Sequence, residues 1–533
     1  MKKLVLLILA LNGLSLSIDA QSKLDQNWIL GFRNSAPNNP SVGYFGGMKM
    51  KFENNTVSLD TFKIYCNTPT GVANSSEGNL LFYTSGCSIY NSQHEIMENG
   101  EDIHEGENIF CPPNDYVPGD NLIKSGTIVL NVPNSADKYV LLNLRIEGDI
   151  FSKMILSEVD MAQNNGLGKV IQKNILLLQD SLIDAVSSVR HANGRDWWII
   201  VPRGTNRSFW KILLTPEGVQ MPILETLPPP YTPFTFTYFI ETSEPPYTEE
   251  VLLPEYIIEC HSIQANFSPN GKYYFRMVKE QEIEIYDFDR CTGTLQLRRL
   301  VPIPSYESNV PYVLAPAGGL AISPNSNLLY FNNTQQLLQL NISTDSIQTS
   351  TPIQIAYYDG FYQDSPLFAA NFFQMRNAPD GKIYMTSGNS VRVLHVINQP
   401  DQPGLACDFK QHSFVLPKWT SWVLNYFPNF NLGAETGSNC DSLSTSAEQY
   451  NRRNNYLKIQ PIPADDMINL QFDDPFDGKI EVFSSVGALI DECTLRNCTN
   501  TSINTSYYPD GIYFITCKKE QINYSIKRFI VHH

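Results

Sequence analysis

Apolar and aromatic residues recur along the chain in short runs, and each run follows a cluster of turn-forming Asn, Asp, Pro, Gly or Ser residues. Three copies of this pattern are clear, and their equivalent residues Ser268, Ser323 and Ala378 stand 55 positions apart. The clear copies occupy residues 265–275, 320–331 and 373–385, and looser copies occupy residues 76–83, 134–141 and 191–200. Since Asn-Gly and Asp-Gly favour tight turns, each copy predicts a strand, a turn and a second strand.

Each copy is followed by another β-rich run, as at residues 282–288, 337–340 and 391–396. The repeating unit is therefore a meander of about four strands, and no strong helical period competes with it. Units of this kind bury their faces best by stacking radially. The sequence therefore predicts an all-β fold with a β-propeller of about seven blades, and six blades is the alternative.

Six hairpins are visible, and a seventh blade is expected to use both ends of the repeat region. Residues 28–32 and 47–52 begin the region and residues 425–430 end it. Pairing these ends would close the ring and remove exposed sheet edges. Residues 227–256 interrupt the period with Pro and aromatic residues, and we expect them to form a loop over one face.

The chain is acidic, with a formal net charge of −16 and a pI near 5.0. This surface argues against nucleic acid or anionic lipid as the main partner. At the N-terminus, two lysines precede an apolar run from Leu4 to Leu16, and a small-residue site follows near Ala20. This order is typical of a cleaved secretory signal peptide at residues 1–20. No later apolar run is long enough to predict a transmembrane helix.

A second β pattern occupies residues 455–533. Apolar residues alternate with other residues at period two around Ile480 and Val482 and again around Ile512 and Phe514, as in half-buried antiparallel strands. Prolines precede the first of these strands, where no ladder donor is needed, and Gly turns separate the others. The segment therefore predicts a small antiparallel β domain.

This segment closely resembles the type A C-terminal sorting domain of the type IX secretion system of Bacteroidota. The residues that carry the resemblance are Pro461, Pro463, Ala464, Gly487, Gly511, Tyr513, Lys527 and Arg528. Two details depart from the family, since Ile462 replaces the usual Asn and the chain ends in two histidines rather than Lys. The resemblance implies an Ig-like β-sandwich that binds the type IX translocon and its sortase-like protease. It also implies passage through the periplasm to the medium or the outer cell surface.

The repeat region is itself similar to exported Bacteroidota proteins that carry a WD-repeat-like propeller. The shared motifs are Trp28–Phe32, Asn79–Asn91, His191–Trp198, Asp287–Gly293 and Pro428–Phe430. This resemblance implies a fold and no activity. The expected layout is a signal peptide at 1–20, a propeller at 21–441, a linker at 442–454 that is cleaved during sorting, and a sorting domain at 455–533.

Ten cysteines in an exported chain favour disulfides over metal, and zinc is not expected because no Cys-x-x-Cys pair occurs. Cys260 and Cys291 flank one strand pair and are one candidate disulfide. Cys493 or Cys498 is expected to reach Cys517 across a hairpin, which leaves one of these three for a partner elsewhere, such as Cys440.

Catalytic motifs are absent from the sequence: it has no Gly-x-Ser-x-Gly, no His-Glu-x-x-His and no Gly-rich phosphate loop. His191 beside Asp196 and Trp197 is the most suggestive cluster, either as a general base at a blade tip or as a locally hydrogen-bonded turn. No cofactor is expected. Calcium is a weak alternative, and its candidate ligands are Asp137, Asp287 and Asp289.

The aromatic residues of the long insertion are the candidate ligand face, and they are Tyr231, Phe234, Phe236 and Tyr247. Such rings stack on a sugar or dock a protein, and the alternative is packing over the propeller. We therefore expect a non-catalytic protein- or glycan-binding module. The rival hypothesis is a carbohydrate hydrolase or lyase with its site at the central channel, and a structural surface component is a third.

Overall fold

The structure, a computed structural model, describes most of the chain between residues 22 and 533. The described ranges are 22–32, 44–54, 56–63, 70–104, 126–147, 150–204, 207–227, 264–278, 282–304, 318–363, 368–420, 423–441, 457–484, 488–519 and 522–533. The predicted signal peptide, the long insertion from residue 228 and the predicted linker therefore lie outside these ranges. Within them the regular structure is β, apart from two short 3₁₀ helices, η2 (Asn164–Gly166) and η3 (Gly404–Cys407).

Among the described residues, seven antiparallel sheets precede the C-terminal domain, and we number them as blades 1 to 7 in chain order. Blade 1 contains β1 (Asn27–Phe32), β2 (Gly46–Glu53) and β3 (Thr56–Phe62), and blade 2 contains β4 (Gly71–Asn74), β5 (Leu80–Thr84) and β6 (Ile89–Asn91). Blade 3 contains β7 (Thr127–Asn131), β8 (Lys138–Glu147), β9 (Ile150–Asp160) and β10 (Lys169–Leu182). Blade 4 contains β11 (Ser187–Arg190), β12 (Trp197–Pro202), β13 (Ser208–Thr215), β14 (Gly218–Val219) and β15 (Ile223–Thr226).

The remaining three blades follow the repeat that is clearest in the sequence. Blade 5 contains β16 (Ala265–Phe267), β17 (Tyr273–Val278), β18 (Glu282–Asp289) and β19 (Thr294–Pro302). Blade 6 contains β20 (Leu320–Ile322), β21 (Leu328–Asn332), β22 (Gln336–Asn341) and β23 (Ile353–Tyr357). Blade 7 contains β24 (Met375–Asn377), β25 (Ile383–Met385), β26 (Val391–Ile397) and β27 (Phe409–Thr420).

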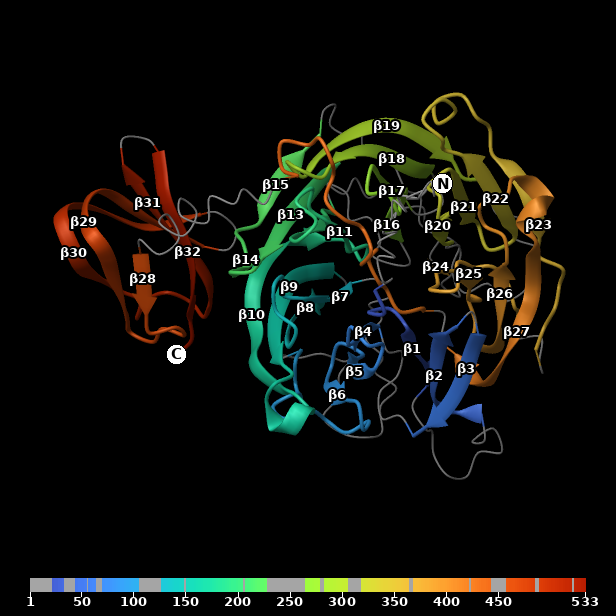
Figure 1. Ribbon diagram of the computed structural model, residues 1–533, viewed down its shortest axis with the longest axis horizontal. Helices are drawn as coiled ribbons and strands as arrows, with labels where there is room; N and C mark the ends of the chain where they lie inside the picture. The colour runs from blue at the N-terminus through green and yellow to red at the C-terminus, as the bar shows by residue number, and fades with distance from the viewer. Residues whose placement is uncertain are drawn as a thin grey trace, which may run out of the picture.

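The blades form a ring in which the first strand of each lies nearest the centre (Figure 1). Neighbouring first strands touch, as β1 does with β4, β16 with β20, and β20 with β24, and β27 of blade 7 contacts blade 1. The prediction of a seven-bladed propeller is therefore confirmed. Its core lies between the blades, where side chains from facing sheets meet. Phe209 of blade 4, for example, packs edge-on against Tyr274 and Tyr286 of blade 5, with ring centroids 5.8 and 5.3 Å apart.

The predicted closure of the ring is wrong in its detail. Residues 425–430 form no strand, and β1, β2 and β3 make blade 1 without them. Instead, the side chain of Asn425 accepts a hydrogen bond from the amide of Ile29, at 2.7 Å. The segment has three aromatic residues and one proline, and it fits a packed loop better than a ladder, because Pro428 has no backbone N–H to donate.

Residues 423–433, which we call the channel segment, run between the inner strands of distant blades. The amide of Leu424 donates to Gln374, just before β24, at 2.8 Å. The hydroxyl of Tyr426 accepts from the amide of Ser188 in β11 at 2.8 Å, on the opposite side of the ring. The segment, orange in Figure 1, therefore crosses the centre of the propeller from blades 7 and 1 to blade 4.

The C-terminal domain is a separate five-stranded unit with its own hydrophobic core. Its strands are β28 (Leu457–Gln460), β29 (Met467–Ser484), β30 (Leu489–Asn504), β31 (Gly511–Lys519) and β32 (Ile522–Val531). The long β29 pairs with β28 through its first half and with β31 through its second half. A bridge between Ala464 and Val531 then brings the β28 side back to β32, which gives the expected sandwich-like closure.

The disulfide predictions are wrong. Cys291 is bonded to Cys440, 149 residues away, so it is not the partner of Cys260, which lies outside the described residues. Cys493, Cys498 and Cys517 are free. The physical reason is the strand order: β29 lies between β30 and β31, so Cys493 and Cys517 are both paired with Ile480, on opposite sides of it. Cys87 is also disulfide-bonded.

Candidate functional site

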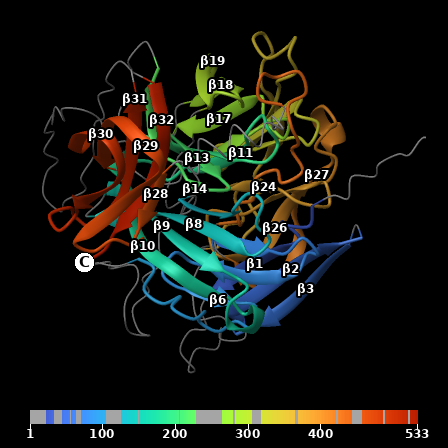
Figure 2. The ribbon, with the colours of Figure 1, turned by 60° about the vertical axis from the view of Figure 1, so that its left-hand side comes forward.

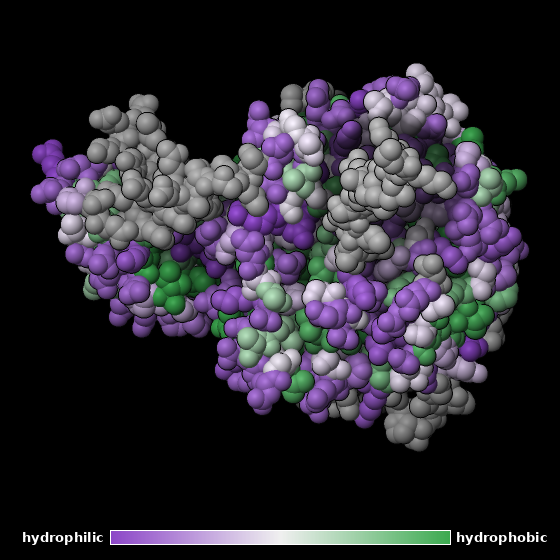
Figure 3. Space-filling view, in the orientation of Figure 1, coloured by the Kyte–Doolittle hydropathy of each residue, from purple (hydrophilic) through white to green (hydrophobic). Residues whose placement is uncertain are grey.

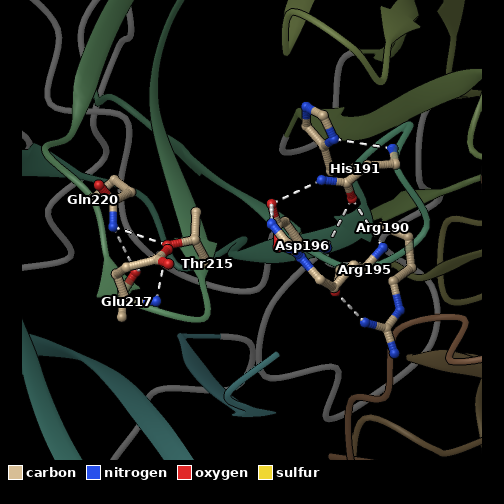
Figure 4. Close-up of polar contacts among 9 residues, drawn as sticks. Arg190, His191, Arg195, Asp196, Thr215, Glu217 and Gln220 are labelled. Carbon is tan, nitrogen blue, oxygen red and sulfur yellow. Dashed lines mark hydrogen bonds and ion pairs between the residues drawn. The ribbon is translucent and has the colours of Figure 1, made fainter. Parts of the chain in front are cut away.

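The turn between β11 and β12 holds the predicted His191 and Asp196 pair, and Figure 4 shows its contacts. The Nδ1 atom of His191 accepts the amide of Asn193 at 3.0 Å, and its Nε2 atom lies 3.0 Å from the carbonyl oxygen of Cys291. The carboxylate of Asp196 binds the side chains of Asn193 and Arg195, at 2.8 and 2.7 Å. Both groups are thus committed to holding the turn, which favours the local-turn alternative over a general base.

This turn also anchors residues 433–440, which follow the channel segment. The carbonyl oxygen of Ala192 accepts the amide of Glu435 at 2.8 Å. The guanidinium of Arg290 donates to the carbonyl oxygens of His191 and Gly433, and the Cys291–Cys440 disulfide follows directly. The His-Ala-Asn-Gly turn therefore acts as an anchor between blades 4 and 5 and residues 433–440.

The three aspartates considered for calcium do not form a site. Asp287 accepts from the guanidinium of Arg298 at 3.2 Å, and Asp289 accepts the amide of Cys291 within its own turn at 2.8 Å. Asp137 belongs to the turn before β8 in blade 3, two blades away from them.

The centre of the ring is filled around Tyr426. The guanidinium of Arg376 in β24 lies over the ring of Tyr426 at 5.1 Å and donates to Asn266 of β16 at 3.2 Å. Burial lowers the pKa of Arg376 to about 10, and Tyr426 and Asp184 offset part of this effect. The position that the hydrolase hypothesis gives to a catalytic site is therefore occupied by a side chain of the protein itself.

An open groove lies at the rim of the propeller instead, between the outermost strands of blades 6 and 7. We call it the rim groove; it has a volume of about 410 Å³. It is lined by Ile355, Ala356, Asp359, Leu405, Asp408, Phe409, Lys410, Gln411 and His412. These residues come from β23 and the turn after it, from η3, and from the start of β27, which lie side by side at the edge of the ring in Figure 1.

The polar groups of the rim groove are oriented by one another. The Nε2 atom of His412 lies 2.9 Å from Oδ2 of Asp359, and the side-chain amide of Gln411 donates to the carbonyl of Tyr357 at 2.9 Å. The ring of Phe361 stacks on His412, with centroids 4.2 Å apart. The groove thus has a fixed aromatic stack at one end and groups that donate and accept hydrogen bonds beside it.

Exposed apolar side chains occur on the elements that form the rim groove. Leu405 and Val415 are 79% and 67% exposed, and Tyr357 is 43% exposed. Lys410 and Asp408, which both line the groove, form an exposed ion pair at 3.0 Å. Apolar side chains gathered around a concave polar site are typical of a binding surface. Green and purple residues also alternate closely along this edge of the ring in Figure 3.

Local backbone geometry explains why the sequence did not reveal the rim groove. Asp408 and His412 both take left-handed φ angles, of 51° and 37°, and the pairing of β26 with β27 shifts register in the same stretch. These features turn side chains of an outer strand toward β23, which is about one repeat earlier in the chain. The aromatic residues Tyr231, Phe234, Phe236 and Tyr247, which were predicted as the ligand face, lie outside the described residues.

The described sorting-motif residues lie after β28, at the start of β31 and in β32. Pro461, Pro463 and Ala464 follow β28, and the carbonyl oxygen of Ala464 accepts the amide of His532 at 2.8 Å. Gly511 and Tyr513 begin β31, and the hydroxyl of Tyr513 donates to the carbonyl of Pro509 at 2.7 Å. Lys527 and Arg528 lie in β32, whereas Gly487 lies outside the described residues.

Comparison with known families supports the C-terminal assignment. Residues 458–532 match the family described as the secretion system C-terminal sorting domain. The C-terminal domain is therefore a type IX sorting domain, and the protein is exported, to the cell surface or out of the cell. No helix among the described residues is long and apolar enough to cross a membrane.

Comparison with solved structures finds other proteins over the propeller at low identity. The periplasmic gluconolactonase of Pseudomonas aeruginosa aligns with 76% of this chain and 99% of its own at 11% identity, with a TM-score of 0.41. AztD of Citrobacter koseri aligns with 75% and 98% at 11% identity and a TM-score of 0.35, and the Dos1 propeller aligns with 64% and 72% at 10% identity and 0.34. At these scores the likeness carries no argument about activity. No curated protein matches the sequence.

Proposed function

We propose that the exported propeller is a non-catalytic binding protein and that its ligand is a glycan held in the rim groove. The observation that carries this proposal is the combination of exposed rings with oriented polar groups. A sugar presents apolar faces, which stack on aromatic rings, and hydroxyl edges, which need both donors and acceptors. The ring of Tyr357 and the Phe361–His412 stack supply the aromatic surface. The side chains of Asp359, Lys410 and Gln411 supply the donors and acceptors.

The crossed channel supports binding over turnover at the ring centre. A channel-facing hydrolase needs acids that converge on a space large enough for substrate. Tyr426 occupies this space between Ser188 of blade 4 and Arg376 of blade 7. The rim groove does hold one pair with acid–base chemistry, His412 and Asp359, so released sugar must be measured together with binding.

A protein ligand is the second candidate, and the edge position of β23 favours it. β23 ends its sheet, so one side of its backbone has no ladder partner in blade 6. Extended peptides add to such edges through main-chain hydrogen bonds.

The test uses the mature full chain, residues 21–533, on glycan and polysaccharide arrays with released reducing sugar assayed in parallel. We expect binding without release. Tyr357→Ala and Phe361→Ala should each weaken binding about threefold to tenfold, the value of one aromatic contact. The control is Tyr507→Ala, which removes a tyrosine that is 61% exposed on the sorting domain. If the protein releases sugar and His412→Ala abolishes this release, the protein is an enzyme and the proposal is wrong. Binding that is unaffected by both rim variants would place the site elsewhere.

A further inference from the structure

The part of the sorting domain formed by β31 and β32 is buried on both of its faces. Only one of these faces packs on the hydrophobic core of the sorting domain itself. In β31, every residue from Gly511 to Cys517 is buried, and in β32 Phe529, Ile530 and Val531 are all buried. Since successive side chains of a strand point to opposite faces, something other than the domain's core must cover half of these residues. By contrast, nearly all of β30 is exposed or half-exposed.

The second face is covered by the propeller. Tyr513, Ile515, Phe529 and Val531 pack in the core of the sorting domain. The alternate residues Ile512, Phe514 and Ile530 belong to a hydrophobic cluster of the propeller that includes Leu177, Leu178 and Val219. β31 and β10 touch, and Figures 1 and 2 both place β32 beside β10 and β14.

The same contact holds the basic residues of the sorting motif. The guanidinium of Arg528 binds the carboxylate of Glu158 in β9 at 2.9 Å, and the two side chains are only 18% and 19% exposed. Arg528 also lies against Gly218 of β14, where an added Cβ would stand 3.2 Å from its guanidinium. Burial lowers the pKa of Lys527, and the nearby carboxylate of Glu217 offsets part of this effect.

We propose that the propeller binds the sorting domain as a ligand, through the face of β31 and β32 that carries Arg528, and keeps it bound after the linker has been cut. The contact is apolar at its centre and has a partly buried ion pair at its edge, as specific protein interfaces do. Two consequences follow. Cutting the linker at 442–454 does not by itself release the sorting domain, and Arg528 faces the propeller while the contact persists.

The test is made on the mature full chain, with a specific protease sequence in place of residues 443–449. After complete cleavage at about 1 μM protein, we expect the two fragments to elute together in size-exclusion chromatography. Arg528→Glu should raise the dissociation constant of the fragments about tenfold or more, because it sets two carboxylates against each other in a partly buried place. Arg496→Glu makes the same change on exposed β30 and should leave the constant unchanged.

The charge swap separates a specific contact from a folding defect. Glu158→Arg combined with Arg528→Glu restores the opposite pair, and we expect it to recover most of the lost affinity. Phe514→Asp, in the apolar centre, should separate the fragments. The proposal is overturned if the unmodified fragments separate at about 10 μM, or if Arg496→Glu weakens their association as much as Arg528→Glu does.

Discussion

Glu284 is the most buried charge of the propeller and connects two blades. Its carboxylate binds Arg207 of blade 4 at 2.9 Å and Arg276 of blade 5 at 2.6 Å, and it accepts the hydroxyl of Tyr286 at 2.6 Å. Burial alone would raise the pKa of Glu284, but the charge and hydrogen bonds of Arg276 hold it below its ordinary value. Such a network is costly to break, because removal of one partner leaves other charges buried without compensation.

We therefore expect Glu284→Ala to lower the free energy of unfolding by about 3–5 kcal/mol, because two buried guanidiniums lose their counter-charge. The control is Glu282→Ala, which removes a more exposed carboxylate that binds Arg207 at 3.3 Å, and it should cost about 1 kcal/mol or less. Urea unfolding measures both. Equal losses in the two variants would show that the buried network around Glu284 stabilises the fold no more than the more exposed Glu282 ion pair does.

His395 is a buried neutral base next to the rim groove. Its Nδ1 atom accepts the amide of His412 at 3.0 Å, which fixes the start of β27 against β26. Burial, together with the nearby His412, lowers the pKa of His395 to about 3 from an ordinary value of 6.5. The unfolded chain therefore binds a proton at a pH where the folded chain does not.

The pH dependence of the free energy of unfolding follows from the lowered pKa of His395. Stability from His395 is complete above about pH 6.5 and is lost as the pH falls toward 3, with a slope of at most about 1.4 kcal/mol per pH unit. His395→Gln keeps an acceptor and cannot titrate, so its unfolding free energy should fall less steeply between pH 6.5 and 4 than that of the wild type. Parallel curves for the two proteins would contradict the assignment.

At the scale of elements, the repeat depends on a turn that needs a left-handed residue. Gly271, Ser326 and Gly381 occupy equivalent positions in blades 5, 6 and 7, and their φ angles are 73°, 63° and 78°. Glycine reaches this region without a Cβ clash, and other residues enter it at a cost. The Asn-Gly and Asp-Gly pattern visible in the sequence is the direct result of this geometry.

Gly381→Ala tests the turn without steric interference, because an added Cβ would meet nothing within 4 Å. We expect a loss of about 1 kcal/mol in the free energy of unfolding from the φ angle alone. Gly433→Ala also places its Cβ in open space, but it has no left-handed φ, and it should change stability by less than about 0.5 kcal/mol. Thermal unfolding compares the two, and the idea fails if Gly433→Ala is the more damaging.

The strands were predictable from the sequence because their signals are local. The turns at residues 268–272 and 323–327 and the buried runs after them define β16 to β18 and β20 to β22 almost residue by residue, whereas β19 was expected only as a further strand of the unit. Features made by distant segments were not predictable. The Cys291–Cys440 bond, the path of residues 425–430 and the rim groove all depend on which blades become neighbours, and a periodic pattern does not encode this.

At the scale of the whole molecule, blade 7 packs directly against blade 1, and the channel segment with the residues that follow it adds contacts across the ring. Asn425 binds blade 1, Tyr426 binds blade 4, and Cys440 is bonded to blade 5. Each contact joins the end of the propeller to a different blade. The segment therefore resists opening of the ring in the way that a shared outer strand does in other closed sheets.

Cys440→Ser should lower the stability of the propeller by about 2–4 kcal/mol, because the disulfide constrains a loop of 149 residues in the unfolded chain. Thermal unfolding of the oxidised protein measures the loss. Cys407→Ser is the control, since Cys407 is a free thiol. A reducing agent should lower the melting temperature of this control, and it should change the melting temperature of Cys440→Ser less. Equal sensitivity to reduction in both proteins would contradict a stabilising role for this bond.

The most direct test of a glycan site at the rim is hydrogen–deuterium exchange of the full mature chain with and without a glycan that it binds. If the glycan binds in the rim groove, exchange slows only in residues 353–361 and 404–415, which form the rim groove and its surroundings. Protection of residues 187–190 and 423–433 instead would place the ligand in the channel and contradict the assignment of the site to the rim.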